Sequence, residues 1–266
     1  MAQAKTVLIT GASAGIGREL VKVFAQHGFN VVLVARSLDK LEALAVETRM
    51  TQGVEAAVVA ADLATPQGPQ IVFDTVRQQG IAVDVLVNNA GVSVVGSFND
   101  IPLARQLELL QLNVAALTAL THLFLQPMLK RANGRILNVA SLAAFGPLPR
   151  VAVYAASKAY VLSFTEALAV ELSDTGVSVT VLCPGPTATA MMEKWSVLTN
   201  HQAEVPAFLM MKPEDVAREG FEACMSGKTV YVHGLVNQLT SSWMQYSPRW
   251  LVRRLGGLLT RRAKPL

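Results

Sequence analysis

Three side chains near the middle of the chain have the types and the spacing that proton transfer needs. Ser141 follows the apolar run 135–139, and Tyr154 and Lys158 come shortly afterwards, four residues apart. Residues with that spacing lie one turn apart on the same face of a helix. A free phenol has a pKa of about 10, and a neighbouring cation favours the phenolate and lowers this pKa toward working pH. The pair therefore suits acid–base chemistry, although Tyr-x-x-x-Lys is a weak signal by itself.

A glycine-rich turn near the N-terminus gives the pair a chemical context. Residues 10–17 read Thr-Gly-Ala-Ser-Ala-Gly-Ile-Gly, between the apolar run 7–9 and the helix-like segment 18–24. Strand, glycine turn and helix in this order form the context of a dinucleotide-binding fingerprint. Such glycines let backbone N–H groups approach a pyrophosphate at a helix N-terminus. We therefore expect cofactor contacts from Gly11, Ser13, Gly15, Ile16 and Gly17.

Strand-like and helix-like segments alternate along most of the chain, which is typical of a parallel sheet covered on both faces. After the first strand, the apolar runs predict strands at 29–35, 54–60, 83–87, 135–139, 177–182 and 229–232. Helices are predicted at 38–48, 66–79, 102–131, 153–172 and 213–225. The expected fold is α/β, with a doubly wound, seven-stranded parallel sheet in the order 3-2-1-4-5-6-7. We expect one Rossmann-like domain over residues 1–266, with a basic C-terminal extension from about residue 234.

The end of the second strand bears on the choice of cofactor. In folds of this kind an acidic residue at that place binds the ribose 2′-hydroxyl of NAD, whereas an arginine accommodates the 2′-phosphate of NADP. Here Arg36 follows the strand, and the first carboxylate comes later, at Asp39. A guanidinium matches the charge and geometry of a phosphate. NADP(H) is favoured over NAD(H), and an ordinary exposed arginine is the alternative.

Two further polar segments follow strands at the same edge of the sheet, where ligands of doubly wound folds bind. Asp62 could accept a hydrogen bond from an adenine amino group, or it could cap the next helix. The amides of Asn88 and Asn89 could brace the sheet, while Gly91 lets the backbone approach a cofactor. The cofactor contacts expected here are Asp62, Leu63, Asn89, Ala90 and Gly91.

Taken together, residues 5–232 resemble the short-chain dehydrogenase/reductase family. The matching motifs are the glycine turn, 88–91, Asn113, Ser141, Tyr154 with Lys158, and 184–189 after the sixth strand. The resemblance implies an NADP-dependent enzyme that interconverts a carbonyl and a secondary alcohol by hydride transfer, using the pro-S hydride. It implies that Tyr154 is the general acid and base and that Ser141 holds the substrate oxygen. It also implies that Lys158 binds the nicotinamide ribose and lowers the pKa of Tyr154.

Two more assignments come from the resemblance alone. Asn113 is implied to kink its helix and to hold a water that links Lys158 to solvent; without the family it is an ordinary solvated or capping amide. The loop after the sixth strand is implied to meet the nicotinamide end of the cofactor. Its expected contacts are Pro184, Gly185, Thr187 and Thr189.

The segment after this loop is strongly apolar and rich in methionine, whose flexible side chain adapts to irregular surfaces. It predicts either a lid over a lipophilic ketone or aldehyde, or packing against the body of the protein. Residues 93–98 and 142–149 are expected as the other walls of a substrate cleft. Two other functions remain open: a narrow 3-oxoacyl or steroid reductase, and a cofactor-binding scaffold or regulatory protein without turnover. The candidate lid residues are Met191, Met192, Trp195, Val197, Leu198, Phe208, Leu209, Met210 and Met211.

The composition is typical of a cytoplasmic α/β protein with much buried surface. Hydrophobic residues make up 52% of the chain and charged residues 16%. We expect no signal peptide, and the uncharged windows 109–129 and 229–248 contain too many polar or proline interruptions for a clean membrane span. Cys183 and Cys224 lack metal-ligand spacing and are expected to be reduced. His27 ends the first helix, and neither it nor the other histidines, including His233, is assigned chemistry, so no metal is expected.

The net charge of +4 comes from the tail, because residues 223–266 contain seven Lys or Arg and no Asp or Glu. The folded body is therefore not expected to bind nucleic acid. Apolar or small residues all round the predicted helices 102–131 and 153–172 favour a homodimer or homotetramer. Leu251, Leu255, Leu258 and Leu259 follow helical spacing, and Arg254 and Arg261 lie on another side of such a helix. This pattern suits an anionic membrane surface, but Gly256–Gly257 weakens the helix, and docking on the body or on another subunit is favoured.

Overall fold

The computed structural model describes residues 4–193 and 209–254. Seven parallel strands form one sheet in the order β3-β2-β1-β4-β5-β6-β7, which confirms the predicted fold class and strand order. Because the order reverses between β1 and β4, the carboxyl ends of these two strands flank the crevice where ligands of such sheets bind. The strands are β1 (Thr6–Thr10), β2 (Asn30–Ala35), β3 (Ala56–Ala60), β4 (Val85–Asn88), β5 (Gly134–Val139), β6 (Val177–Cys183) and β7 (Val230–Val232).

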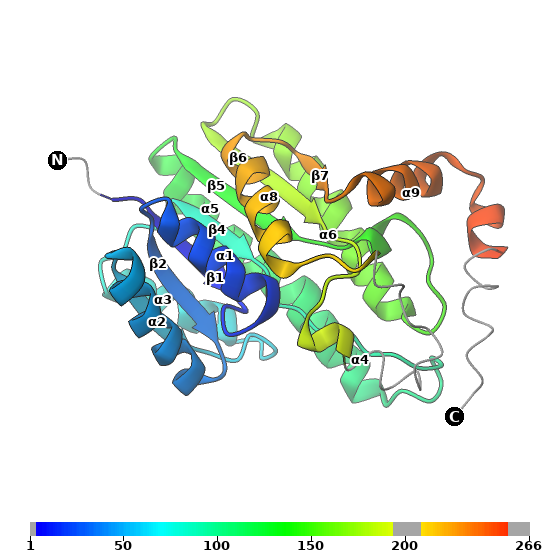
Figure 1. Ribbon diagram of the computed structural model, residues 1–266, viewed down its shortest axis with the longest axis horizontal. Helices are drawn as coiled ribbons and strands as arrows, with labels where there is room; N and C mark the ends of the chain where they lie inside the picture. Colours follow the sequence, from blue (N-terminus) through cyan, green and yellow to red (C-terminus); the bar gives the residue numbers. More distant parts are fainter. Residues whose placement is uncertain (1–3, 194–208, 255–266) are drawn as a thin grey trace.

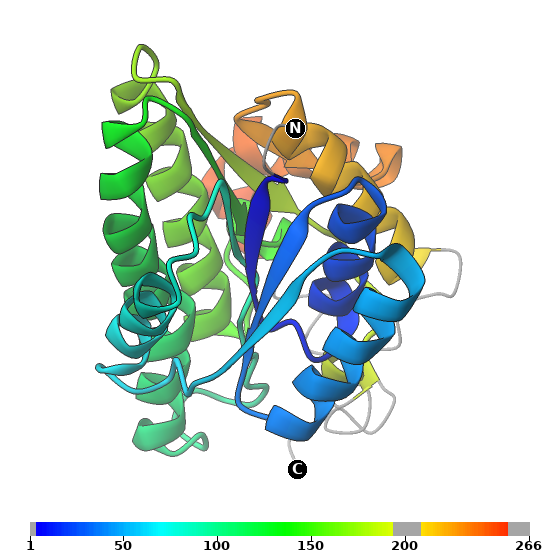
Figure 2. The ribbon, with the colours of Figure 1, turned by 90° about the vertical axis from the view of Figure 1, so that its left-hand side faces the viewer.

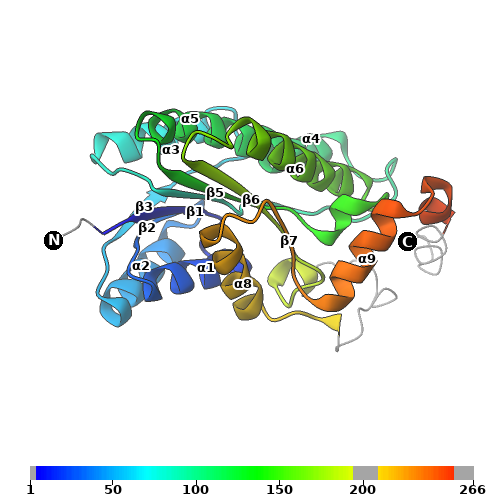
Figure 3. The same ribbon diagram turned by 90° about the horizontal axis from the view of Figure 1, so that it is seen from above.

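Helices cover the sheet in two layers (Figures 2 and 3). One layer contains α1 (Gly15–Gln26), α2 (Leu38–Gln52) and α8 (Pro213–Met225). The other contains α3 (Gly68–Gln78), α4 (Leu103–Leu110), α5 (Leu117–Lys130) and α6 (Ala152–Glu171). Each layer buries its own apolar cluster against one face of the sheet. This explains why the strands are continuous apolar runs: both of their faces are covered.

The long helix predicted over 102–131 is interrupted in the middle. Between α4 and α5 lies one π-helical segment, η1 (Gln111–Ala116). By length and mean hydropathy, 1.3, the continuous segment Leu103–Lys130 could cross a membrane. It instead packs on the sheet through fully buried residues such as Leu109, Leu120 and Met128. The segment is therefore a core helix of the fold.

Two elements were not predicted from the sequence. A short 3₁₀ helix, η2 (Leu142–Phe145), follows β5 directly. Beyond β7, at the end of the molecule opposite the N-terminus, lies α9 (Leu235–Tyr246) (Figure 1). A further helical segment covers residues 249–254. These elements extend the fold past the carboxyl ends of β5 to β7.

Buried amides connect the central strands, as the sequence predicted. The Asn88 side chain donates hydrogen bonds to Asn138 Oδ1 at 2.9 Å and to Thr121 Oγ1 at 3.0 Å. Asn138 in turn donates to Thr165 Oγ1 of α6 at 2.9 Å. Hydrogen bonds between buried polar groups are costly to break because each group would be left without a partner. The ladder therefore fixes α5 and α6 to the carboxyl ends of β4 and β5.

Candidate active site

The glycine turn after β1 is held in place by the segment after β4. Asn89 donates its side-chain amide to the Thr10 carbonyl at 2.8 Å, and the backbone N–H groups of Asn89 and Ala90 donate to Thr10 Oγ1. Gly11 adopts a φ of 67°, which favours glycine. A Cβ on Gly17 would lie 2.2 Å from the Gly11 carbonyl oxygen. The sequence therefore needs a glycine at both positions to bring α1 against the turn.

The N-terminus of α1 opens into a cavity of about 720 Å³. Its first turn carries no acidic residue, and its N-cap, Ala14, offers no side-chain hydrogen bond. The backbone N–H groups at this helix end therefore have no intrahelical partner and attract an anion through the helix dipole. A pyrophosphate suits this place by charge and by the close backbone approach that the glycines permit.

Ser141 and Tyr154 meet at the wall of the same cavity. Ser141 stands at the end of β5 and caps η2, where its hydroxyl accepts a hydrogen bond from the Ala143 N–H at 3.2 Å. The Tyr154 hydroxyl, from the first turn of α6, is hydrogen-bonded to the Ser141 side chain. Two hydroxyl groups from different elements therefore point to one place, where they can hold the same substrate oxygen.

Lys158 lies one turn after Tyr154 and is buried. Its ammonium donates to the Val139 carbonyl at 2.8 Å and lies 5.8 Å from the centre of the Tyr154 ring. A Cβ on Gly91 would lie 3.5 Å from Lys158 Nζ. The lysine is thus packed under the segment after β4 and beside the tyrosine, with its ammonium at the cavity wall.

Burial is the largest cause of the pKa shifts of Tyr154 and Lys158. It raises the pKa of Tyr154 above its ordinary value, and the hydrogen bond from Ser141 opposes that rise. The net shift of the Tyr154 pKa is upward because removing the phenolate from water costs more than the Ser141 hydrogen bond returns. The lowering of this pKa by Lys158 stays a prediction. Burial also lowers the pKa of Lys158 to about 8, against a smaller opposing effect of Cys183. Lys158 can therefore exchange a proton close to neutral pH.

Asn113 sits in η1, and the predicted kink of its helix is present as this π-helical turn. The side chain donates to the Val92 carbonyl at 3.0 Å and accepts from the Val92 N–H at 2.9 Å. It also donates to Ser157 Oγ at 3.1 Å. Asn113 does not line the cavity itself. It ties η1 to the segment after β4 and to α6, and its water-holding role stays a prediction.

The cavity brings together all the other residues that the sequence singled out for the site. Arg36 is exposed at its rim, and its guanidinium makes no hydrogen bond or ion pair with residues 4–193 or 209–254. Asp62 also lines the cavity, and its Oδ1 accepts from the Ala64 N–H at 3.0 Å, so it caps the turn before α3. The expected residues at the wall are Gly11, Ser13, Gly15, Ile16, Gly17, Arg36, Asp62, Leu63, Asn89, Ala90, Gly91, Ser141, Tyr154, Lys158, Pro184, Gly185, Thr187 and Thr189.

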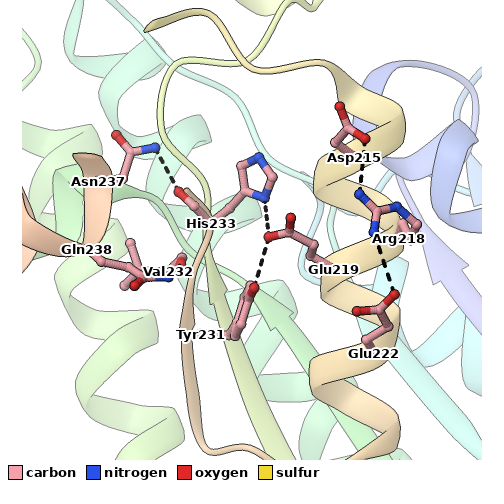
Figure 4. A network of polar contacts seen from close by, with 9 residues as sticks. All are labelled: Asp215, Arg218, Glu219, Glu222, Tyr231, Val232, His233, Asn237 and Gln238. Atoms are coloured by element: carbon pink, nitrogen blue, oxygen red, sulfur yellow. Dashed lines mark hydrogen bonds and ion pairs between the residues drawn. The ribbon is translucent and has the colours of Figure 1, made fainter. Parts of the chain in front are cut away.

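A polar network behind the loop 184–189 was missed by the sequence analysis (Figure 4). Glu219 of α8 lies 2.6 Å from Nδ1 of the buried His233 and accepts from the Tyr231 hydroxyl at 2.9 Å. Burial, with the Glu219 carboxylate, raises the pKa of Tyr231 to about 12. Asn237 of α9 donates to the His233 carbonyl and packs so closely on Gly185 that a Cβ there would lie 2.3 Å from its Nδ2.

Residues 5–198 match the family model described as short chain dehydrogenase. The chain belongs to the short-chain dehydrogenase family. It is an oxidoreductase of that family, and the expected resemblance is confirmed. The match ends before α8, β7 and α9, so these elements of the site lie outside the region that the family model describes.

Similar proteins in this family share most of the length of the chain. The mouse 17-beta-hydroxysteroid dehydrogenase type 3 is 31% identical over 260 residues, which span 96% of this chain and 83% of that protein. A solved 7beta-hydroxysteroid dehydrogenase has a TM-score of 0.84 at 29% identity and covers 95% of this chain and 96% of its own. A short-chain dehydrogenase from Sphingobium yanoikuyae in complex with NADPH has a TM-score of 0.79 at 29% identity, with coverages of 92% and 97%.

A nicotinamide cofactor fits the residues that form one end of the cavity. The glycines leave room for close backbone contact, and the α1 N-terminus supplies N–H donors for a pyrophosphate. Lys158 and Tyr154 then lie toward the other end, beside the loop 184–189. This order along the cavity agrees with a cofactor that runs from the glycine turn to the reacting groups of a short-chain dehydrogenase.

The substrate end of the cavity differs from the expectation in several places. Met191 and Met192 line the cavity. Met211 does not: its backbone forms an isolated parallel β-bridge with Thr187, and it packs on the core cluster that includes residues of α8. Leu209 and Met210 are not among the lining residues, and Trp195, Val197, Leu198 and Phe208 lie outside the described residues. Of the expected wall 93–98, only Ser93 reaches the cavity. The segment 142–149 contributes as predicted, through Leu142, Ala143, Pro147 and Leu148.

The C-terminal elements form a wall of the substrate end that the sequence did not predict. Thr240, Trp243 and Met244 of α9 line the cavity, together with Val252. A Cβ on Gly146 would lie 2.4 Å from Met244 Cε and 3.1 Å from Val252 Cγ1, so α9 packs tightly on the segment after η2. Val252 is buried, which shows that the start of the basic tail docks on the body. The leucines at 255, 258 and 259 lie outside the described residues.

Proposed function

We propose that the protein is an NADP(H)-dependent oxidoreductase that interconverts a lipophilic ketone or aldehyde and the corresponding alcohol. The observation that carries this proposal is the hydrogen bond between Ser141 and Tyr154 in a cavity that also contains the glycine turn. The cofactor supplies or accepts the hydride when bound. Tyr154 donates its phenolic proton to the substrate oxygen, and Ser141 holds that oxygen in place.

Lys158 supports this proton transfer from behind the tyrosine. Its ammonium remains fixed by the Val139 carbonyl while its pKa, lowered by burial to about 8, allows proton exchange near neutral pH. The segment after β4, with Gly91, packs on Lys158, and Asn113 fixes that segment through Val92. These contacts hold Tyr154 and Lys158 in one orientation, which general acid–base catalysis requires.

NADP(H) is proposed over NAD(H) because of Arg36. Its exposed guanidinium at the rim of the cavity follows β2, where folds of this kind distinguish the 2′-hydroxyl from the 2′-phosphate of the ribose. The first carboxylate after β2 is Asp39, inside α2. The NADPH complex of the relative from Sphingobium yanoikuyae also supports this choice.

A steroid is the second candidate substrate. Two observations favour it: the names of the hydroxysteroid dehydrogenase relatives, and the apolar side chains at the substrate end. A rigid four-ring substrate needs a large apolar cleft, and Leu148, Met192, Trp243 and Met244 provide one. A 3-oxoacyl thioester is the third candidate, because such a chain would also contact an apolar wall.

The deciding experiment follows the absorbance of reduced nicotinamide with a panel of carbonyl substrates. The panel contains small and bulky ketones, aldehydes, 3-ketosteroids, 17-ketosteroids and a 3-oxoacyl thioester, each with NADPH and with NADH. Oxidation of NADPH with at least one carbonyl is expected. NADPH binding without oxidation against the whole panel would favour the scaffold function instead.

We also propose that the protein forms a homodimer or homotetramer through α4 and α6. Leu103 and Leu107 of α4 and Tyr160 and Val170 of α6 are exposed large apolar side chains on neighbouring helices. A second copy would remove them from water. Sedimentation analysis tests this, and a monomer at micromolar concentration would contradict it. A cytoplasmic location is proposed with it, supported by the two buried, free thiols of Cys183 and Cys224.

A further inference from the structure

Most of the large apolar side chains of α9 face solvent, whereas Asn237, Ser241 and Met244 face the protein. Asn237 and Ser241 are 5% and 4% exposed and point to the body of the protein. Leu235, Leu239 and Tyr246 are 78%, 73% and 83% exposed. A surface helix of a soluble protein has the reverse arrangement, because its apolar stripe faces the core. Residues 4–193 and 209–254 therefore leave the outward stripe of α9 without a partner.

The outward stripe is continuous and uncharged along the helix. Leu235, Leu239, Trp243 and Tyr246 follow each other at intervals of four, four and three residues, so they share one face. Trp250, four residues later, is also exposed. Residues 235–248 contain no charged side chain. Aromatic and aliphatic side chains in such a row are typical of segments that lie at a membrane–water interface.

Cations without counter-charges flank this stripe. Arg249, Arg253 and Arg254 are exposed directly after it, and the sequence adds Arg261, Arg262 and Lys264 further on. No Asp or Glu occurs in residues 223–266. The exposed leucines of α4 differ in this respect, because an Arg105–Glu108 ion pair lies among them. The α9 surface is therefore both apolar and purely cationic.

This charge pattern decides between two occupants. In a twofold-symmetric pair both copies contribute the same surface, so an interface through α9 would gather Arg249, Arg253 and Arg254 of both copies with no carboxylate from residues 223–266 to pair with them. An anionic lipid surface meets the arginines with the opposite charge, and each cation near such a surface contributes about 1 kcal/mol, a factor of about five in affinity. The observed pattern thus favours lipid over a second copy.

We propose that the outward stripe of α9, with Trp250 and the arginines after it, docks on an anionic lipid bilayer. The stripe lies at the mouth of the cavity, because Trp243 is partly exposed in the stripe and also lines the substrate end. A lipophilic substrate dissolved in the bilayer then reaches the cavity beside Trp243 without crossing water. Docking stands independently of the catalytic activity, whereas this delivery of substrate rests on the proposed function.

Co-sedimentation of the full chain with lipid vesicles tests the docking. Vesicles of phosphatidylcholine with phosphatidylglycerol are compared with vesicles of phosphatidylcholine alone, at about 0.1 M and about 1 M salt, where the Debye length falls from about 10 to about 3 Å. Binding is expected to the anionic vesicles at low salt, with weaker binding at high salt. The variant Leu235→Gln/Leu239→Gln should bind at least about tenfold more weakly, because two apolar side chains no longer enter the lipid.

A matched control tests whether the loss of binding is specific to the α9 surface or follows from the loss of any exposed apolar side chains. Met50 of α2 and Ile71 of α3 are exposed large apolar side chains that lie outside α9 and outside the proposed subunit interface. The variant Met50→Gln/Ile71→Gln should bind vesicles like the wild type. The variant Arg253→Gln/Arg254→Gln should lose affinity for anionic vesicles by at least about fivefold. Unchanged thermal unfolding midpoints of the variants establish that each one is folded.

Two results would overturn the proposal. One is no binding of the wild type to anionic vesicles at low salt. The other is equal binding by the wild type and by Leu235→Gln/Leu239→Gln. If the leucine variant instead dissociates an oligomer in sedimentation velocity while the wild type ignores vesicles, α9 is an interface between copies. Turnover of a water-soluble ketone without vesicles reports separately on the proposed enzymatic function.

Discussion

At one end of the cavity the wall consists mainly of backbone, and at the other end it consists of side chains from distant parts of the chain. The cofactor end uses the turn at 10–17 and the segment after β4, which contact each other through Thr10 and Asn89. The substrate end uses η2, residues 190–192 and α9, which meet only in the folded protein. Backbone contacts suit a cofactor shared by a family, whereas side-chain contacts allow specificity to change without altering the sheet.

The reacting groups lie between these two ends. Ser141 ends β5, and Tyr154 and Lys158 begin α6, so both elements belong to the sheet framework. The substrate end lies past them, and its α9 wall lies beyond residues 5–198 of the family match. Substitutions at the two ends and at this junction should therefore have separable effects, and five substitutions test that separation.

The largest effect is expected at the junction. Tyr154→Phe should lower turnover by roughly 10²- to 10⁴-fold, the usual contribution of a general acid or base, while NADPH binding and stability remain. Tyr160→Phe, which removes a hydroxyl bonded to Thr118 at the surface of α6, should retain turnover. Steady-state kinetics and NADPH titration measure both. Substantial turnover by Tyr154→Phe would show that Tyr154 is not the general acid or base.

The second prediction concerns the pH dependence of stability. The pKa of Lys158 falls from 10.5 to about 8 on folding, so between these pH values the unfolded chain binds the additional proton. Below pH 8 Lys158 therefore lowers the free energy of unfolding by about 3 kcal/mol. This penalty disappears as the pH rises from about 8 to about 10.5. Denaturant unfolding of the wild type and of Lys158→Met should diverge by this amount across the window. Parallel curves would contradict it.

The third prediction tests the backbone wall at the cofactor end. Gly17→Ala forces a Cβ to within 2.2 Å of the Gly11 carbonyl oxygen, and should lower the free energy of unfolding by about 1–3 kcal/mol and weaken NADPH binding. Gly80→Ala meets no atom within 4 Å but keeps a φ of 67°, so only its backbone strain of about 1 kcal/mol is expected, with unchanged NADPH binding. Equal NADPH affinities in the two variants would show that the turn tolerates a side chain.

The fourth prediction concerns the choice of cofactor. Arg36→Ala should weaken NADPH binding by about ten- to a hundredfold, since a charged hydrogen bond contributes roughly 1.5–3 kcal/mol, and should leave NADH binding nearly unchanged. Lys40→Ala, an exposed cation four residues later on α2, serves as the control and should affect neither. Fluorescence titration with both cofactors measures the ratio. Equal losses for NADPH and NADH would make Arg36 structural.

The smallest effect is expected at the substrate end. Trp243→Ala should raise KM for a bulky apolar ketone by about tenfold through lost apolar contact, with KM for NADPH unchanged. Tyr246→Ala removes an exposed aromatic side chain of α9 that does not line the cavity, and should leave both values unchanged for a water-soluble substrate. A change in KM for NADPH alone would show that the two ends of the cavity are not independent.

Most of the cofactor end could be predicted because its signals are local in the sequence. The glycines at 11 and 17 belong to a glycine-rich turn between a strand and a helix, a pattern that is visible in a few consecutive residues. The continuous apolar runs likewise indicate strands that are covered on both faces. Asn113 was selected only through the family resemblance, because an amide inside a helix gives no signal of its own. The cofactor and catalytic roles stay predictions, although the structure brings nearly all of these residues to one cavity.

The substrate end could not be predicted, and α9 shows why. Leu235, Leu239 and Tyr246 face solvent, whereas the polar Asn237 packs on Gly185 and the apolar Met244 packs on Gly146. Hydrophobic periodicity therefore gives no indication of which face of α9 packs on the body. Met211 belongs to the core and His233 has the Glu219 carboxylate, although nothing near either residue in the sequence points to these contacts. The sequence by itself determined the sheet, the glycine turn and the order of the reacting groups, because these depend on backbone geometry and short spacings. Only the tertiary structure decided which side chains form the substrate wall, because that depends on contacts between segments far apart in the sequence, such as Gly146 with Met244.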